Sequence, residues 1–335
     1  MNRLGNNCCI NATLQIILNN PELRRMWEEC FQEIANIYNE ALYKGWASAP
    51  ETIGDEFRKQ LVQKSSSNLI DQNIFTQEDP TAFLEAFFNI CKERLDLSHL
   101  EIHFEKMKYK QVGDGKTEPS IEQPENHKYF RISINNQFNQ KASLEELLRK
   151  HCLEINEIEE NGVNVRYISE DQYVSLPNHL IIDLFTNNRK DASDVCIPIN
   201  LHFPQDLLKE SSTHTYELEG FIVHLGETDK SGHYIAYRKV NNQWKKFDDS
   251  QVTDVNENQL QQLLGNFQEE ELKYSNPYAA FQKESECQQT DNHALKEQSS
   301  FLYKLLGTVK STAKSFFKED SNPYVCMLSY SKKQP

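Results

Sequence analysis

The chain lacks the long hydrophobic runs that mark membrane-spanning segments. No apolar stretch approaches the roughly 18 to 20 residues that a transmembrane helix needs. The first residues also lack the basic-then-apolar pattern of a secretory signal peptide. We therefore expect no transmembrane helix and a protein that works in the cytosol, including a host cytosol if the chain is a secreted effector.

Closely spaced cysteine pairs are absent as well. The eight cysteines lie at positions 8, 9, 30, 91, 152, 196, 287 and 326, and none of them form a Cys-x-x-Cys pair. This spacing excludes the usual zinc-ligand patterns and does not suggest a disulfide framework. Free thiols in a reducing compartment are the expectation.

A basic excess is missing too. The chain of 335 residues has 36 Lys and Arg against 50 Asp and Glu, which gives a net charge of −14. This balance argues against nucleic acid as a partner, because no positive excess is available to neutralise phosphates. It permits a basic protein partner. With 38% hydrophobic and 26% charged residues, the composition is that of a globular protein.

What is present begins with a candidate nucleophile. Cys8 follows the segment Leu4-Gly5-Asn6-Asn7, and apolar residues recur at helical spacing from Ile10 to Leu18, before Pro21. The pattern predicts a helix that begins at or next to Cys8. A helix N-terminus favours a thiolate through its dipole and its unpaired backbone N–H groups. A cysteine alone is more often a small buried hydrophobic residue, so this interpretation depends on partners elsewhere.

A histidine and a carboxylate pair supply those partners. His233 lies in a strand-like segment, Gly232 to Tyr237, and Asp248-Asp249 end a second one that contains Trp244. A tight turn between two strands would bring the carboxylate to the imidazole. A histidine in a strand and two aspartates after an aromatic residue are each common in purely structural roles. Together with Cys8, in the order Cys, His, Asp, they predict the nucleophilic triad of papain-like cysteine proteases.

Both motifs resemble the cysteine and histidine boxes of the ubiquitin-specific proteases. The matching positions are Leu4, Gly5, Asn6, Cys8, Asn11, Leu14 and Gln15 in the first box, and His224, Gly226, Gly232, His233, Tyr234, Trp244, Phe247, Asp248, Asp249 and Val252 in the second. Segments 77–84, 143–148, 176–182 and 322–330 resemble further landmarks in the family's order. Asn11 selects Cys8 over Cys9, because the family has an Asn three residues after its nucleophile.

The resemblance implies an α+β, papain-like fold with thumb, palm and fingers in a single catalytic domain. Its parts would be a helical thumb over 1–97, short zinc-free fingers over about 98–175 and a β-rich palm over 176–335. An insertion over about 256–320 interrupts the palm. Within it, residues 299–318 form an amphipathic pattern with a basic face, which predicts either a helix packed on the palm or one that docks to a membrane or a partner.

The resemblance also implies a function and its residues. Cys8, His233 and Asp248 would cleave the bond after the C-terminal glycine of ubiquitin, with no metal and no organic cofactor. The residues expected to support the oxyanion are Asp249 and Asn2, and those expected to contact the substrate are Gln15, Gln77, Asp79, Gly232 and Tyr234.

Two departures from the family pattern keep alternatives open. Arg3 stands where the family has an Asn that stabilises the oxyanion, and the loss of one such donor typically costs roughly 100-fold in rate. Ala82 stands where the family has a Glu that, with the Asp at position 79, lines the channel for the ubiquitin tail. The alternatives are therefore a protease for a ubiquitin-like modifier and a weakly active or inactive ubiquitin-binding module.

Overall fold

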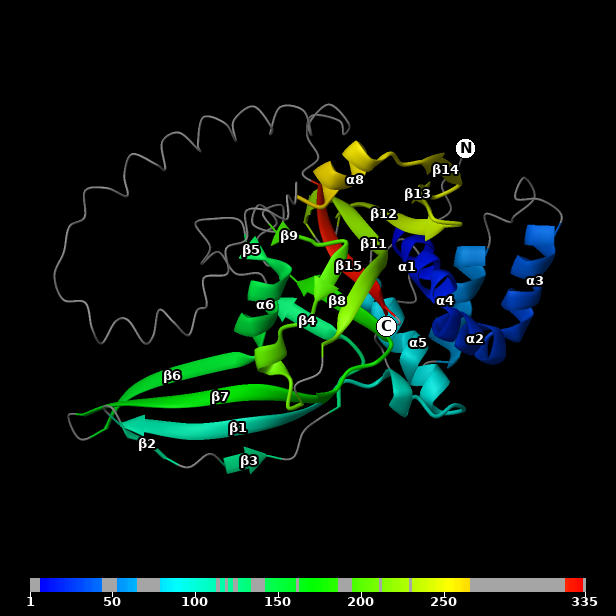
Figure 1. The fold of residues 1–335 in the computed structure, drawn as a ribbon. Helices are drawn as coiled ribbons and strands as arrows, with labels where there is room; N and C mark the ends of the chain where they lie inside the picture. Colours follow the sequence, from blue (N-terminus) through cyan, green and yellow to red (C-terminus); the bar gives the residue numbers. More distant parts are fainter. Residues whose placement is uncertain are drawn as a thin grey trace, which may run out of the picture. The chain divides into compact units, whose positions relative to one another are not determined.

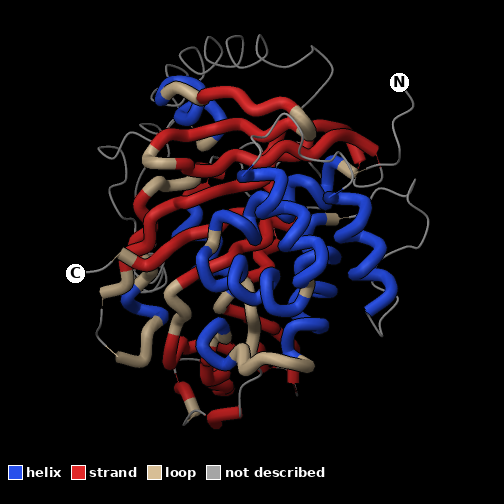
Figure 2. Tube along the Cα trace, turned by 90° about the vertical axis from the view of Figure 1, so that its right-hand side faces the viewer, coloured by secondary structure: helices blue, strands red, loops and turns tan. Residues whose placement is uncertain are grey.

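A layer of helices covers one face of a large β-sheet in the computed structural model (Figures 1 and 2). The structure describes residues 7–43, 53–64, 79–112, 115–117, 120–122, 126–133, 142–160, 163–185, 195–210, 213–228, 231–265 and 323–333. Asn2, Arg3, Gln77 and most of the expected insertion, including residues 299–318, lie outside the described residues.

The helices form the lobe that the sequence predicts at the start of the chain. They are α1 (Cys8–Asn19), α2 (Pro21–Cys30), α3 (Gln32–Tyr43), α4 (Ile53–Lys64) and α5 (Pro80–Lys92), followed by a 3-10 turn, η2 (Ser98–Leu100). Pro21 follows the end of the first helix and is the first residue of the second. The Asn20 side chain caps the second helix, because it accepts hydrogen bonds from the backbone N–H groups of Glu22 and Leu23, at 3.0 Å each. None of the described helices is long and apolar enough to span a bilayer.

An aromatic cluster holds this lobe together. Trp27, Phe31, Phe57 and Phe87 are fully buried and come from α2, its C-terminal end, α4 and α5. Their ring centroids lie 5.0 to 6.5 Å apart, mostly edge to face. Such pairs add stabilisation beyond area burial alone, so α4 is tied to α2 and α5.

The palm is a sheet of order β14-β13-β12-β11-β15-β8-β4, with β10 paired to β11. The bounds are β4 (Phe130–Ser133), β8 (His179–Phe185), β10 (Asn200–His202), β11 (Thr215–Thr228), β12 (Ser231–Val240), β13 (Gln243–Asp248), β14 (Gln251–Asp254) and β15 (Pro323–Lys332). Its pairs are antiparallel except β4 with β8. The last strand of the chain therefore enters the middle of the sheet, and α1 packs against β12, β11 and β13.

Smaller elements lie around the palm. They are α6 (Leu144–His151), α8 (Glu257–Leu263), η3 (Gln205–Leu207) and a parallel pair of β5 (Ala142–Ser143) with β9 (Val195–Cys196). α6 begins with a capping box, in which the side chains of Ser143 and Glu146 each accept a hydrogen bond from the other's backbone N–H.

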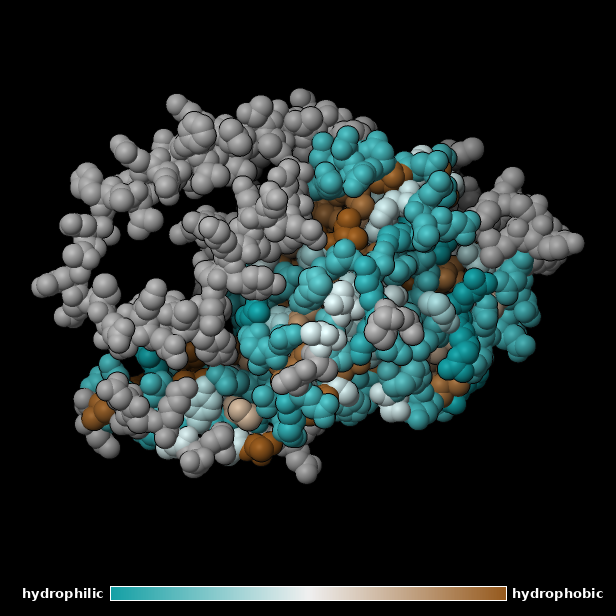
Figure 3. Space-filling model, in the orientation of Figure 1, coloured by the Kyte–Doolittle hydropathy of each residue, from teal (hydrophilic) through white to brown (hydrophobic). Residues whose placement is uncertain are grey.

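The fingers are a separate antiparallel sheet that projects from the palm (Figure 1). It comprises β1 (His103–Val112), β2 (Gly115–Lys116), β3 (Ser120–Glu122), β6 (Leu153–Glu160) and β7 (Val163–Ser175), in the order β2-β1-β7-β6 with β3 also paired to β1. One strand from the predicted fingers range, β4, instead pairs with β8 of the palm. The exact subdivision into 1–97, 98–175 and 176–335 stays a prediction. The surface on the side drawn in Figure 3 is mainly hydrophilic where it is described.

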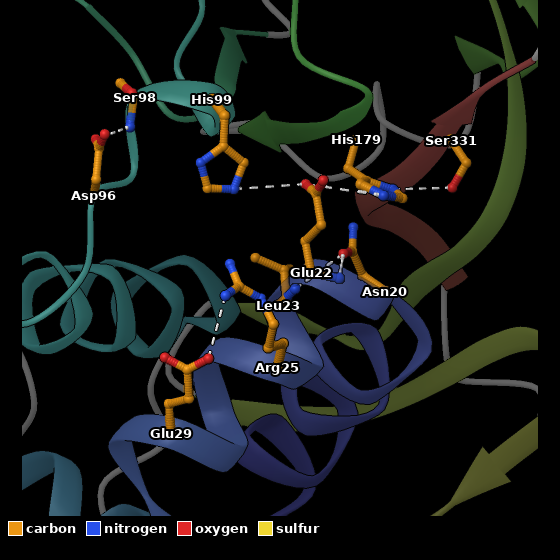
Figure 4. Close-up of polar contacts among 10 residues, drawn as sticks. All are labelled: Asn20, Glu22, Leu23, Arg25, Glu29, Asp96, Ser98, His99, His179 and Ser331. Atoms are coloured by element: carbon orange, nitrogen blue, oxygen red, sulfur yellow. Dashed lines mark hydrogen bonds and ion pairs between the residues drawn. The ribbon is translucent and has the colours of Figure 1, made fainter.

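A polar cluster lies at the seam between the helical lobe and the palm (Figure 4). Glu22 of α2 stands between His99 of η2 and His179 of β8, with 4.0 Å from its Oε2 to each Nε2. His179 also bonds Ser331 of β15 through Nδ1, at 3.1 Å. Burial lowers the pKa of His179 in spite of the nearby Glu22 carboxylate. Since 4.0 Å exceeds hydrogen-bonding distance, the glutamate attracts these rings mainly when they are protonated.

Candidate active site

Cys8 is the first residue of α1, as the sequence predicts. Its side chain has little access to solvent, since the residue is 8% exposed. The first intrahelical bond runs from Asn11 N to Asn7 O at 2.9 Å, and the Asn7 side chain does not cap the helix. The N–H of Cys8 therefore has no partner within the helix. This is a suitable position for a donor to a developing oxyanion.

His233 on β12 is hydrogen-bonded on two sides. One bond involves the thiol of Cys8, and Nε2 lies 2.6 Å from Asp248 Oδ1. The bond to Cys8 raises the pKa of His233, burial lowers it, and the bond to Asp248 raises it again, to about 9 in total. The His233 ring therefore carries a proton at neutral pH. An imidazolium hydrogen-bonded to a cysteine is the setting in which such a residue acts as a nucleophile.

Asp248 ends β13 and reaches the histidine because of a tight hairpin. Asn241 and Asn242 form the turn with positive φ values of 52° and 62°, which matches the two-residue turn favoured between antiparallel strands. The second carboxylate oxygen, Oδ2, lies 2.8 Å from the ammonium of Lys246. Burial raises the pKa of Asp248, but the bonds from Lys246 and His233 outweigh it, so the pKa is lowered and the group is ionised at neutral pH.

Gly232 allows β12 to approach β11 next to the catalytic histidine. Its φ of +148° favours glycine, and a Cβ there would lie 2.3 Å from Leu225 O and 2.5 Å from the His224 ring. No other residue fits without moving one of these neighbours. The glycine of this motif is therefore needed to position His233, the residue that follows it.

Asp249 connects the turn after Asp248 to the catalytic helix. Its Oδ1 accepts a hydrogen bond from Asn11 Nδ2 at 3.0 Å. Asn11 lies three residues after Cys8, so the two side chains share one helix face. The chain of contacts that starts at Cys8 and passes through His233, Asp248 and Asp249 thus returns to α1 one turn further on.

The start of α4 holds the other side of this helix. A Cβ at Gly54 would lie 2.2 Å from Asn11 Oδ1, so α4 contacts Asn11 with no room for a side chain. Asp55 accepts a hydrogen bond from the Asn7 side chain. Both contacts fix the first turn of α1, on which Cys8 stands.

One group of possible metal ligands occurs in the described part of the chain. It consists of His233, Asp248 and Asp249, whose ligand atoms lie within 4.8 Å of one another. The histidine and Asp248 already bond each other, Lys246 occupies Asp248 Oδ2 and Asn11 bonds Asp249. This arrangement is suited to proton transfer between Cys8 and His233.

The structure brings together the predicted triad and separates some of the predicted substrate contacts from it. Gln15 shares the Cys8 face of α1, and its half-buried side chain has an Oε1 with no hydrogen-bond partner among the described residues. Tyr234 is only 2% exposed, and its ring lies 4.3 Å from His224, so it packs behind the site rather than on its surface. The substrate roles of these residues and of Gly232 stay predictions. So do the substrate role of Gln77 and the oxyanion role of Asn2, both of which lie outside the described residues.

Asp79 caps α5 and lies near a second, buried carboxylate. It accepts a hydrogen bond from Thr81 N at 2.8 Å, and Ala82 is half-buried on the same helix. Burial, together with the negative charge of Asp79, raises the pKa of Asp183 on β8 to about 7, although Arg131 Nε lies 3.4 Å away. The carboxyl groups in this part of the structure are therefore those of Asp79 and Asp183, and the sequence did not indicate the second one.

The contacts of four further residues at the site were not predicted. Asn11 was recognised as a position of the cysteine box, and its contact with Asp249 could have been found, because its spacing from Cys8 places it on the same helix face. Lys246 stands two residues before Asp248, and its role could be inferred from strand alternation. Gly54 and Asp55 gave no such signal, because their role depends on how α4 packs against α1.

Comparisons with known proteins place the chain in a family. The sequence profile described as "Ubiquitin carboxyl-terminal hydrolase" matches residues 1–281. Ubiquitin carboxyl-terminal hydrolase 26 of Oryza sativa subsp. japonica is 34% identical over 82 residues, which are 24% of this chain and 8% of that protein. Ubiquitin carboxyl-terminal hydrolase A of Dictyostelium discoideum is 54% identical over 37 residues, or 11% of this chain and 4% of that protein. The chain thus aligns with only a small part of these curated relatives.

Solved structures share the fold. The Ubp8 deubiquitinating module of SAGA matches with a TM-score of 0.58 at 16% identity, covering 99% of this chain and 68% of the matched one. The same module bound to monoubiquitin matches with a TM-score of 0.57 at 15% identity and the same coverage. These likenesses confirm the α+β, papain-like fold. Because the family profile covers most of the chain, from Met1 onward, this protein belongs to the ubiquitin carboxyl-terminal hydrolase family.

Proposed function

We propose that this protein is a cysteine-type deubiquitinase, which hydrolyses isopeptide or peptide bonds after the C-terminal glycine of ubiquitin. The observation that carries the proposal is the line of contacts from the Cys8 thiol through His233 to Asp248, at the N-terminus of a helix. Family membership supports it. Ubp8, which shares the fold, has been solved bound to monoubiquitin and to ubiquitin aldehyde.

The reaction follows from the geometry of the triad. The Cys8 thiolate attacks the glycine carbonyl, and the N–H of Cys8 stabilises the oxyanion of the tetrahedral intermediate. The His233 imidazolium then protonates the leaving amine, which leaves a thioester on Cys8. Water, deprotonated by His233, hydrolyses the thioester and releases the ubiquitin carboxylate and the free thiol. Asp248 keeps the imidazole oriented throughout, and none of these steps needs a metal or an organic cofactor.

The setting proposed for this activity is the cytosol, with ubiquitin conjugates as partners and no nucleic acid. The described cysteines are free thiols, which suits a reducing compartment. The net charge of −14 favours a basic protein partner over a polyphosphate.

A ubiquitin bearing a C-terminal electrophile tests the proposal. Wild type should form a covalent adduct, and Cys8→Ala should form none. Cys9→Ala is the matched control, because this neighbouring thiol is fully buried and its loss should leave the adduct intact. Ubiquitin binding without an adduct would favour the binding-module alternative that Arg3 suggests, and an adduct on Cys9 would refute the assignment of Cys8.

A protease for a ubiquitin-like modifier is the second candidate, favoured by Ala82. One carboxylate fewer on α5 weakens charge-assisted recognition of a basic tail. Parallel reactions with ubiquitin and ubiquitin-like electrophiles separate the two candidates. Ala82→Glu should shift the preference toward ubiquitin if the missing acid matters. The same preference in wild type and in Ala82→Glu would argue against a role for position 82 in selecting the modifier.

A further inference from the structure

The triad carboxylate is held by two cations, one on each oxygen. Asp248 Oδ1 lies 2.6 Å from His233 Nε2, and Oδ2 lies 2.8 Å from Lys246 Nζ. The side chains of Asp248 and Lys246 are each 30% exposed, so the pair is partly shielded from water. The lysine is therefore the second partner of the group that orients the catalytic histidine.

Strand alternation builds this contact into β13. Lys246 and Asp248 are two residues apart and project from the same face of the strand. Lys245, between Trp244 and Lys246, projects from the opposite face and pairs with Asp254 of β14. Only one of the two adjacent lysines can reach the triad.

The charged groups around Asp248 show that Lys246 helps to keep this carboxylate ionised. Among the described residues, Lys246 and His233 are the cations that lower the pKa of Asp248. The other ionisable groups near it are Asp249 in the turn and Tyr237 on β12, neither of which carries positive charge. Without Lys246, only His233 would oppose the effect of burial, so the pKa of Asp248 would rise.

We propose that Lys246 is a positioning residue, which acts on catalysis through Asp248. By holding Oδ2 it turns Oδ1 toward His233, and by its charge it keeps the carboxylate ionised in mildly acidic solution. The site then consists of four groups in contact, in the order Cys8, His233, Asp248 and Lys246. This inference extends the proposed hydrolase function to a residue outside the triad.

The sign of the expected effect follows from the proton balance at Asp248. Protonation of Asp248 removes the acceptor that orients His233 and supports its positive charge, so His233 activates Cys8 less well as pH falls. Removing Lys246 raises the pKa of Asp248, and this loss then begins at higher pH. If Lys246 had only a structural role, its removal would lower activity or stability without moving the low-pH side of the pH–rate profile.

Lys246→Met, Lys246→Arg and the control Lys245→Met test this directly. The first measurement is the rate of Cys8 alkylation by iodoacetamide between pH 4 and 9, followed by peptide mass spectrometry, which needs no ubiquitin. Lys246→Met should move the acid limb up by about one pH unit, as expected for the loss of one close charge partner. Lys246→Arg should restore most of the profile, and Lys245→Met should match wild type.

Turnover of a ubiquitin fluorophore conjugate supplies the second readout. Lys246→Met should reduce kcat by about tenfold with little change in KM. In an Asp248→Asn background, Lys246→Met should cause no further loss, because the lysine no longer has a carboxylate to hold. An unshifted alkylation profile in Lys246→Met, or additive losses in the double variant, would overturn the proposal. Failure of wild type to process ubiquitin would count against the proposed function alone, because the alkylation profile still decides the role of Lys246.

Discussion

The catalytic corner and the fingers sheet differ in how their strands are covered. We call Cys8, Asn11, His233, Asp248 and Asp249 the catalytic corner; there α1 packs directly on β12 and β13. The fingers strands contact mainly one another, while α6 packs on β6 and η3 packs on β7. Fingers residues such as Ile121 and Ile158 are accordingly 63% and 47% exposed, whereas Tyr234, beside His233, is 2% exposed.

This contrast reflects different physical demands. Acyl transfer requires a thiolate, an imidazole and a carboxylate at fixed distances, and a misplacement of 1 Å can cost about 100-fold in rate. Close packing supplies such rigidity. A sheet held by cross-strand pairs can adjust to a protein surface at small energetic cost. We therefore expect substitutions to act strongly on kcat at the corner and weakly in the fingers.

The largest effect should follow from Gly232→Ala. A methyl group at this position would lie 2.3 Å from the Leu225 carbonyl oxygen, which is backbone and cannot rotate away. The strand must shift and take His233 with it, so kcat/KM should fall at least about 100-fold, and stability should fall by roughly 1 to 3 kcal/mol. Steady-state kinetics and thermal unfolding measure both changes.

Gly220→Ala on β11 is the matched control. Its added methyl would lie 3.1 Å from Tyr237 O and 3.2 Å from the end of the Ile16 side chain, so small adjustments suffice. Its activity should stay within about threefold of wild type. If Gly232→Ala behaved like this control, the fixed approach of β12 to β11 would not set the position of His233.

Much of this organisation could be predicted from the sequence, because its signals are local. Apolar spacing and Pro21 placed α1, and the residue types around His233 and Asp248 placed the hairpin and the triad. The resemblance of the two boxes then gave the fold class. The parallel pairing of β4 with β8 was not predicted, because pairing between distant segments leaves no local pattern in a short strand.

The supports of the active site were harder to predict for a similar reason. The bond from Asn11 to Asp249 joins residues 238 positions apart, and the contact of Gly54 with Asn11 depends on helix packing. Tyr234 shows how little a motif position says about burial. Its place in the histidine box suggested a substrate contact, but alternation along β12 turns it inward while its neighbour His233 faces Cys8.

A smaller effect should come from the buried charge of the palm, Asp183→Asn. Burial raises the pKa of this carboxyl from its ordinary 3.8 to about 7, so the folded state holds the proton more tightly than the unfolded state. The resulting stability is present below the unfolded pKa and is lost as pH rises through about 7. The Asn variant should therefore gain stability relative to wild type between pH 5 and 8. Each pKa unit is worth about 1.4 kcal/mol, which sets an upper bound of about 4 kcal/mol.

The fingers provide the control for this charge. Glu157, which pairs with Arg166, has a side chain 58% exposed, and Glu157→Gln should change stability by less than about 1 kcal/mol. Urea titrations of both variants at pH 5 and pH 8 make the comparison. A flat difference between Asp183→Asn and wild type across this range would mean that Asp183 stays ionised, held by Arg131.

The smallest effect should come from Ile155→Thr on the open face of the fingers. Ile155 is 37% exposed and stands opposite Ile168, which is 7% exposed, with Tyr109 beyond it in the same row across three strands. Threonine keeps the β-branched shape that favours strands, so unfolding free energy should change by less than about 0.5 kcal/mol. Ile168→Ala in the same row should cost roughly 2 kcal/mol, because it removes a buried side chain. Both variants should keep the wild-type kcat, since neither touches the elements that hold Cys8 or His233. A fall in kcat for Ile155→Thr, measured with stability unchanged, would show that the fingers transmit strain to the catalytic corner and that the two regions are not independent.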